Sequence, residues 1–281
     1  MVLSHKEIKY LNKRVFEKVV MSIDFKRGEK YFTENEACFL FLKNGSLQFR
    51  TPTHVLTYTQ NEAMLAKCGD YFIEPLSTSE NEKTNTITAI GAFFYPDVVK
   101  GLFGQDLSLH QLNSGYDVLK IDTEPWMRSF IDSLDFLLDN PSVVDDNVVV
   151  NKLRELILLL SKNQKAESVH QFIASLFVAH EYNFREIIQA NTYADLTLEE
   201  LAHLCGMSLS TFKRTFKNTY HETPAHYFRV KRLQKAAELL KNTTLRISDI
   251  CYECGFKDVS YFSKAFNTHY KINPSEFRIS G

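Results

Sequence analysis

Two cysteines near the C-terminal end of the sequence stand at a spacing that can carry chemistry. Cys251 and Cys254 form a C-x-x-C pair, which occurs in redox-active dithiols and as half of a zinc site. A tetrahedral zinc site needs two further ligands, and the chain has no second C-x-x-C pair to supply them. What these two thiols do therefore depends on the elements that surround them.

An internal repeat in the last 85 residues accounts for the cysteines as packing residues. At an offset of 49 residues, Leu201, Ala202, Cys205 and Gly206 match Ile250, Cys251, Cys254 and Gly255. After one inserted residue, Ser210, Phe212, Phe216, Tyr220 and Pro224 match Ser260, Phe262, Phe266, Tyr270 and Pro274. Because Ala202 in the first copy matches Cys251 in the second, this position of the repeat requires a small apolar residue. A buried free cysteine behaves as such a residue. Redox sensing by Cys251 and Cys254 stays as the alternative.

Each copy of the repeat has the pattern of a helix-turn-helix unit. In the first copy the apolar residues Leu198, Leu201, Ala202 and Cys205 recur at helical spacing and end at Gly206. Thr197 and Glu200 fit a capping box at the start of this helix. A short helix, a glycine turn and a second helix predict units at about 197–217 and 246–267, whose second helices are candidates for a DNA major groove.

The second helix of each copy presents polar residues opposite its two phenylalanines. The predicted DNA-binding residues are Ser210, Lys213, Arg214 and Lys217 in the first copy and Ser260, Ser263, Lys264 and Asn267 in the second. Arg and Lys pair with guanine edges, and Ser, Asn or Lys can contact bases or phosphates. A solvated helix face is the alternative, but the same arrangement in both copies favours DNA contact.

A long helix is predicted between the two copies. Thr223 and Pro224 are an N-cap and first-turn pair, and "PAHYFRVKRLQKAAELLKN" follows without a breaker. At 1.5 Å per residue it spans roughly 27 Å, which can hold two reading helices about one DNA turn apart. Four basic residues on it could touch phosphates or face water, and water is favoured for each: Arg229, Lys231, Arg232 and Lys235.

The stretch from about Phe184 to Arg278 resembles the AraC/XylS family of bacterial transcription regulators, most closely in "RISDICYECGFKDVSYFSKAFNTHYKINPSEFR". The resemblance assigns base or backbone contacts to Ser210, Lys213, Arg214, Ser260, Ser263 and Lys264. It assigns structural roles to Gly206, Gly255, Phe256, Phe262, Phe266 and Pro274. It implies an activator that binds promoter DNA and works with RNA polymerase.

The sequence departs from the family pattern at three positions. His221 and Lys271 stand where the family has glycine, so either the tight turn is lost or each residue adopts positive φ. Arg246 stands where a capping residue belongs, so the first helix of the second unit is expected to begin later, at Ser248.

The front of the chain has the pattern of a β-rich domain. Between Val15 and about Tyr95, short β-rich runs alternate with turn signals, and Asn44-Gly45 predicts a type I′ hairpin between "CFLFLK" and "SLQFR". Such strands predict a small sandwich or open barrel. The resemblance extends loosely to cupin-like regulatory domains, especially those of activators of virulence and type III secretion genes, some of which a partner protein controls.

Two amphipathic helices are predicted after the strands, at Glu124–Leu138 and Asp146–Lys162. The stripe Leu153, Leu156, Ile157 and Leu160 could cover the open face of the sandwich or form a dimer seam, and the dimer is favoured. With a linker at Ser161–Ser168, the fold class is α+β: a regulatory and dimerisation domain over 1–165, which takes a small effector or a regulatory protein, and an all-α DNA-binding domain over 166–281.

No catalytic, metal or cofactor site is predicted. Between Thr33 and Asp106 there is one histidine, His54, which is too few for a metal-dependent cupin, and the common nucleotide-binding and nucleophile motifs are missing. The aromatic residues Phe39, Phe41, Phe49, Tyr58, Tyr71, Phe72, Phe93 and Phe94 could line a ligand pocket, but core packing is the default.

The composition places the expected polyanion partner at the C-terminal end. The net charge of −1 divides into +5 from Thr197 onward (13 basic, 8 acidic) and −6 before it. Five scattered cysteines, Cys38, Cys68, Cys205, Cys251 and Cys254, indicate reduced thiols. The start of the chain lacks the apolar run of a signal peptide and no stretch is long enough for a membrane span, so we expect a cytoplasmic protein.

Overall fold

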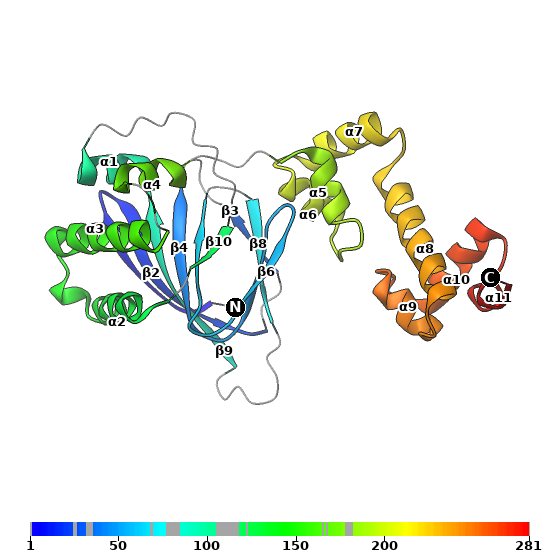
Figure 1. Ribbon diagram of the computed structural model, residues 1–281, viewed down its shortest axis with the longest axis horizontal. Coiled ribbons are helices and arrows are strands. Elements are labelled where there is room, and N and C mark those ends of the chain that lie inside the picture. Colours follow the sequence, from blue (N-terminus) through cyan, green and yellow to red (C-terminus); the bar gives the residue numbers. More distant parts are fainter. Residues whose placement is uncertain are drawn as a thin grey trace. The chain divides into compact units, whose positions relative to one another are not determined.

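The computed structural model describes residues 2–24, 27–31, 36–67, 70–76, 85–104, 118–121, 123–164, 166, 168–177 and 182–280. The chain divides into an N-terminal unit, Met1–Glu181, and a C-terminal unit, Tyr182–Gly281 (Figure 1). The first is a β-sheet domain with helices and the second is helical, as the α+β prediction required. No described helix is both long and apolar enough to cross a membrane.

The N-terminal unit holds two antiparallel sheets. The six-stranded sheet has the order β1 (Val2–Tyr10), β2 (Lys13–Ser22), β9 (Thr86–Phe94), β4 (Ala37–Asn44), β7 (Ala63–Ala66) and β10 (Val118–Ile121). The four-stranded sheet has the order β3 (Gly28–Tyr31), β8 (Asp70–Pro75), β5 (Leu47–Arg50) and β6 (Val55–Tyr58). The sequence pattern missed β1, β3 and β10. Strand β1 is an edge strand whose side chains are nearly all exposed, so it lacks the apolar alternation that marks a half-buried strand.

The predicted Asn44-Gly45 hairpin is wrong. Strand β4 belongs to the six-stranded sheet and β5 to the four-stranded one, so the chain crosses between sheets at this point. Gly45 does adopt positive φ (87°), and a Cβ there would stand 2.8 Å from Cγ1 of Ile87. The glycine is needed for a close approach to β9 and not for a two-residue hairpin.

A two-residue hairpin occurs instead between β1 and β2. Leu11 and Asn12 have φ of 50° and 61°, and the strands on either side pair through Tyr10 and Lys13. Positive φ at both central residues is the type I′ conformation. Leu-Asn is a weak signal for this turn, because only the asparagine favours the left-handed region.

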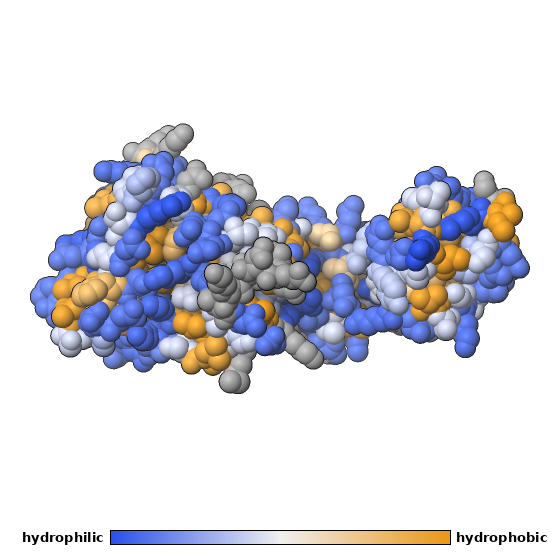
Figure 2. Space-filling model, turned by 90° about the horizontal axis from the view of Figure 1, so that it is seen from below, coloured by the Kyte–Doolittle hydropathy of each residue, from blue (hydrophilic) through white to orange (hydrophobic). Residues whose placement is uncertain are grey.

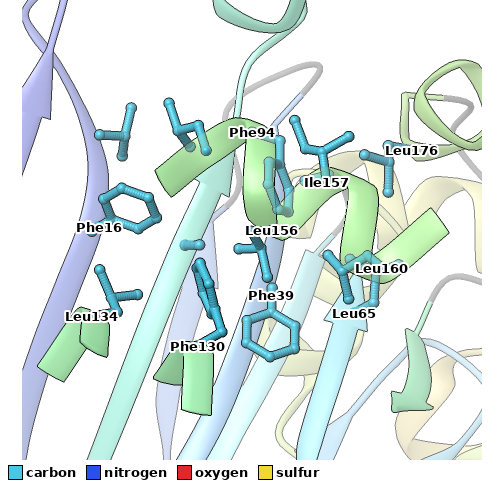
Figure 3. Close-up of a cluster of buried hydrophobic side chains, with 14 of the residues drawn as sticks. Phe16, Phe39, Leu65, Phe94, Phe130, Leu134, Leu156, Ile157, Leu160 and Leu176 are labelled. Atoms are coloured by element: carbon cyan, nitrogen blue, oxygen red, sulfur yellow. The ribbon is translucent and has the colours of Figure 1, made fainter. Parts of the chain in front are cut away.

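Helices α2 (Pro125–Asp139) and α3 (Asp146–Asn163) confirm the two predicted amphipathic helices. The stripe Leu153, Leu156, Ile157 and Leu160 is at most 1% exposed and packs on residues of the six-stranded sheet such as Phe39, Leu65 and Phe94 (Figure 3). The proposal that this stripe forms a dimer seam is therefore wrong, because the sheet of the same chain already covers it.

Two short helices complete this layer. Helix α1 (Pro96–Phe103) and helix α4 (Val169–Leu176) contribute buried residues to the same core, among them Val99, Phe172 and Ile173. Because α4 packs here, the N-terminal unit extends beyond the predicted boundary between residues 165 and 166, which was placed too early. The predicted linker likewise begins inside α3, where Ser161 is buried.

The aromatic residues of the strands are core residues. All eight that could have lined a ligand pocket are at most 5% exposed. The described gap beside Phe49, Tyr58 and Met64 has a volume of only about 10 Å³, which is too small for an organic ligand. The outer surface of the chain, in the view of Figure 2, mixes hydrophobic side chains with a majority of hydrophilic ones.

The C-terminal unit consists of seven helices in its described residues. They are α5 (Phe184–Ala190), α6 (Leu198–Leu204), α7 (Leu209–Tyr220), α8 (Pro224–Asn242), α9 (Ile247–Glu253), α10 (Val259–Tyr270) and α11 (Pro274–Ser280). Helix α8 runs from the cluster of α5, α6 and α7 to the cluster of α9, α10 and α11 (Figure 1). Each cluster has its own hydrophobic core, and α8 contributes to both.

Candidate nucleic-acid interface

The first helix-turn-helix is formed by α6 and α7, as predicted. The Thr197 side chain accepts a hydrogen bond from the Glu200 N–H (3.1 Å), and Glu200 Oε2 accepts one from the Thr197 N–H (2.7 Å). The helix stops at Gly206, whose φ is 61°, and the Met207 N–H donates to the Ala202 carbonyl (2.9 Å). This reciprocal cap and Schellman-type end confine α6 to two turns.

Aromatic packing orients α7. Phe212 and Phe216 are fully buried with Ile188, Leu201 and Phe228, and the ring centroids of the two phenylalanines lie 5.8 Å apart. Since residues four apart share a helix face, this pair fixes which side of α7 faces outward.

The outward side of α7 carries all four residues predicted for the first copy. Ser210, Lys213, Arg214 and Lys217 are exposed. In the described part of the chain, no carboxylate lies within ion-pair distance of these three cations. The face therefore presents positive charge that no neighbouring side chain neutralises.

The second helix-turn-helix, α9 and α10, repeats this construction. Phe262 and Phe266 are fully buried, with centroids 5.7 Å apart, and Ser260, Lys264 and Asn267 are exposed on the opposite side of α10. Ser263 differs, because it is half-buried and its Oγ donates to the Val259 carbonyl (2.9 Å). Of the four predicted residues, Ser263 is thus the least available to a ligand.

Tyr261 belongs to the same surface, although sequence reasoning missed it. Its side chain is 55% exposed at the start of α10, next to Ser260. The available signal was its position, one residue before the buried Phe262, which turns it away from the core of α10.

The turns after α7 and α10 keep their shape without glycine. His221 and Lys271 adopt φ of 60° and 63°, and their N–H groups donate to the carbonyls of Lys217 (2.9 Å) and Asn267 (2.7 Å). The expectation of residues held at positive φ is confirmed. The delayed start of α9 is wrong: this helix begins at Ile247, with Arg246 as an N-cap that makes no side-chain capping bond.

Arg232 joins the two helix-turn-helix units. From α8 its Nη1 donates to the Gly255 carbonyl (2.9 Å) and its Nη2 to the Ala194 carbonyl (3.0 Å). Partial burial lowers the pKa of its guanidinium. Lys235 similarly donates to the Glu253 carbonyl (3.3 Å). Arg232 and Lys235 therefore connect α8 to the backbone of neighbouring segments. From the sequence we expected them either to contact phosphates or to face water, and neither expectation included this role.

Cys251 and Cys254 are core residues, as predicted. Both are fully buried in the cluster that contains Ile250 and Phe262. Burial raises the pKa of the Cys251 thiol and raises that of Cys254 to about 11, so little reactive thiolate forms near neutral pH. This environment disfavours the redox-sensing alternative. Cys68 lies outside the described residues.

Among the described side chains, no three His, Cys, Asp or Glu residues form a group that could hold a metal ion. His221 and His226 stand at an H-x4-H spacing, but His226 Nδ1 is engaged with the Glu222 carboxylate.

Comparison with known proteins agrees with the division of the chain into an N-terminal and a C-terminal unit. Residues 201–280 match the family model described as a helix-turn-helix domain, and residues 37–172 match the ExsA N-terminal regulatory domain. The second match ends within α4, in line with the assignment of that helix to the N-terminal unit.

Curated relatives include several transcription regulators. The activator RhaS of Mannheimia succiniciproducens is 32% identical over 59% of either chain, and the virulence regulon activator VirF of Yersinia enterocolitica is 28% identical over 46% of this chain and 48% of its own. ExsA of Pseudomonas aeruginosa is 26% identical over 45% of this chain and 46% of its own. The chain thus spans about half to three fifths of the length of these relatives. Along the sequence, an ExsA-type domain is followed by two helix-turn-helix units, each with its own hydrophobic core. Together with these relatives, this makes the chain a member of the AraC family.

Proposed function

We propose that this protein is a sequence-specific DNA-binding transcription activator. The observation that carries the proposal is the pair of exposed polar faces on α7 and α10, each set opposite a buried phenylalanine pair in a duplicated unit. Arg214 and Lys264 lie at equivalent positions of the two faces. Helices of this kind enter successive major grooves when a rigid connector such as α8 spaces them.

The roles of the α7 residues are separable by binding measurements. A preferred site is first selected from random duplexes with the full-length protein. Arg214→Ala is expected to weaken binding to that site by about 1–3 kcal/mol and to relax its sequence preference, if the guanidinium reads a base edge. Lys217→Ala is expected to weaken binding to selected and random duplexes alike and to lower the salt slope by about one, as loss of a phosphate contact does.

Selected and random duplexes are compared by titration at several salt concentrations. An equal loss on both duplexes for Arg214→Ala would mean that Arg214 contacts only the backbone. A wild-type protein that prefers no sequence would overturn the proposed function itself.

The N-terminal unit is proposed to regulate and to pair the chain. Its match to the ExsA regulatory domain supports a cupin-like domain that receives a signal, and the tight packing of its described core favours a regulatory protein over a small effector. Homodimerisation through this unit and contact with RNA polymerase at a promoter complete the proposal.

Trp126 gives a readout for the signal. It is the chain's one tryptophan and lies in α2, so its fluorescence reports unfolding of the N-terminal unit. A bound regulator raises the melting temperature seen by this probe. Metabolite mixtures that raise it, with no effect from candidate regulatory proteins, would reverse the preference for protein control.

A further inference from the structure

A groove lies between the two helix-turn-helix units, on one side of α8. Its volume is about 500 Å³, and it is lined by residues of both units and of α8, including Thr197, Phe228, Arg229, Arg232, Lys257 and Tyr261. We call it the central groove. Arg232 donates hydrogen bonds to the carbonyls of both Gly255 and Ala194. These bonds hold the two walls of the central groove at a defined separation.

The central groove carries cationic groups that are free to bind. Arg229 is exposed, and among the described residues it has no ion-pair or hydrogen-bond partner. Within the described residues Lys257 pairs only with Asp195 (3.2 Å), and both side chains are at least 70% exposed, so water and salt weaken this pair. The Asp258 carboxylate also lines the groove, but it caps α10 by accepting from the Tyr261 N–H (2.5 Å).

The central groove adjoins the reading helix α10. Tyr261 lines the groove and is also exposed at the start of α10, beside Ser260. A duplex that places α7 and α10 in successive major grooves must pass a stretch of its backbone between them. That stretch carries a row of phosphates that a cationic groove at this position can bind.

We infer that the central groove binds the DNA phosphate backbone between the two major grooves, with Arg229 and Lys257 as the contacting cations. This inference rests on the proposed DNA-binding function. The contact adds affinity and fixes the register of the two reading helices without reading bases. Phosphate contact at Arg229 reverses the sequence expectation that this residue faces water.

The test compares two cations on opposite sides of α8. Arg229→Gln removes the groove charge, while Lys231→Gln removes one charge from the other side of the helix, where Lys231 Nζ lies 5.7 Å from the Tyr227 ring centroid. Binding of the full-length variants to selected and random duplexes is titrated against salt. We expect Arg229→Gln, but not Lys231→Gln, to lower the salt slope by about one on both duplexes, and the double variant with Lys257→Gln to lower it by about two.

Neutral methylphosphonate linkages locate the contact on the DNA. Placed one at a time between the two reading sites, one of them should weaken wild-type binding and have no further effect on Arg229→Gln. Equal slopes for Arg229→Gln and Lys231→Gln, or additive losses at every linkage, would overturn the inference. If either of these results is obtained while Arg214→Ala still relaxes sequence specificity, only the inference about the central groove is refuted. A wild-type protein without sequence preference would refute the proposed function instead.

Discussion

The guanidinium of Arg232 donates a hydrogen bond to the backbone carbonyl of Gly255 across 2.9 Å. The same side chain reaches the Ala194 carbonyl, so one residue of α8 ties the turn of the second helix-turn-helix to the segment before the first. The relative orientation of α7 and α10 therefore depends on a partly buried polar contact as well as on the length of the connecting helix.

Replacing Arg232 by methionine should destabilise the C-terminal unit by about 2–3 kcal/mol, because two carbonyls lose a charged donor. Urea unfolding followed by circular dichroism measures the loss, and Trp126 fluorescence should stay unchanged as the control for the N-terminal unit. Arg232→Lys should recover only part of the stability, since an ammonium lacks the planar fork that reaches both carbonyls. Wild-type stability in Arg232→Met would show that the contact is dispensable.

Gly255→Ala should cost more stability than Gly206→Ala. Both glycines end a short helix at positive φ, which costs an alanine about 1–2 kcal/mol. At Gly255 a Cβ would in addition stand 3.2 Å from Cζ of Arg232 and press on its contact. Parallel urea titrations of the two variants provide the comparison, and equal losses would mean that Arg232 yields without cost.

Lys271→Gly should stabilise the second helix-turn-helix by about 1 kcal/mol, because glycine relieves the left-handed conformation at φ 63°. The matched control is His269→Gly, two residues earlier in α10, which should destabilise by about 1 kcal/mol as glycine does inside a helix. Thermal unfolding separates the two signs. A destabilising Lys271→Gly would mean that the lysine side chain contributes more than its backbone strain costs.

Acidification should remove the contribution of Asp139 to the N-terminal unit. Hydrogen bonds from Lys6 and Lys18 lower the pKa of the Asp139 carboxyl. A lowered pKa in the folded state adds stability above the unfolded value of about 4, and this stability is lost as the pH falls through the folded value. Because the Asp139 side chain is 40% exposed, the contribution is at most about 1 kcal/mol.

The measurement is urea unfolding by Trp126 fluorescence at neutral pH and below pH 3. Asp139→Asn should be less stable than wild type at neutral pH, and the difference should shrink in acid. Asp132→Asn, on the exposed side of the same helix, should show little difference at either pH. A difference that does not change with pH would assign the effect to packing.

Local sequence was sufficient for the helix-turn-helix units because their signals lie within a few residues of each other. The capping box at Thr197, the glycine after α6 and the Phe212 and Phe216 pair act over one or two helical turns, and the structure has each as expected. The burial of Cys251 followed from the repeat, since Ala202 occupies the matching place.

The sequence-based predictions were wrong where the structure depends on contacts between residues far apart in the chain. Asn44-Gly45 has the composition of a hairpin, but β4 pairs with β7 and β9 and not with β5. The Leu156 stripe of α3 fits a partner chain as well as a sheet, because an apolar stripe specifies only that something covers it.

The amino-acid sequence by itself determined the duplicated helix-turn-helix units, their outward polar faces and the helix between them, since these follow from spacing along one helix. Only the tertiary structure decided that Arg232 is half-buried and bonded to two carbonyls while Arg229 is exposed in a groove. Both are arginines on one helix, and their difference arises from which distant backbone approaches each side chain. Such an approach leaves no trace in the local pattern.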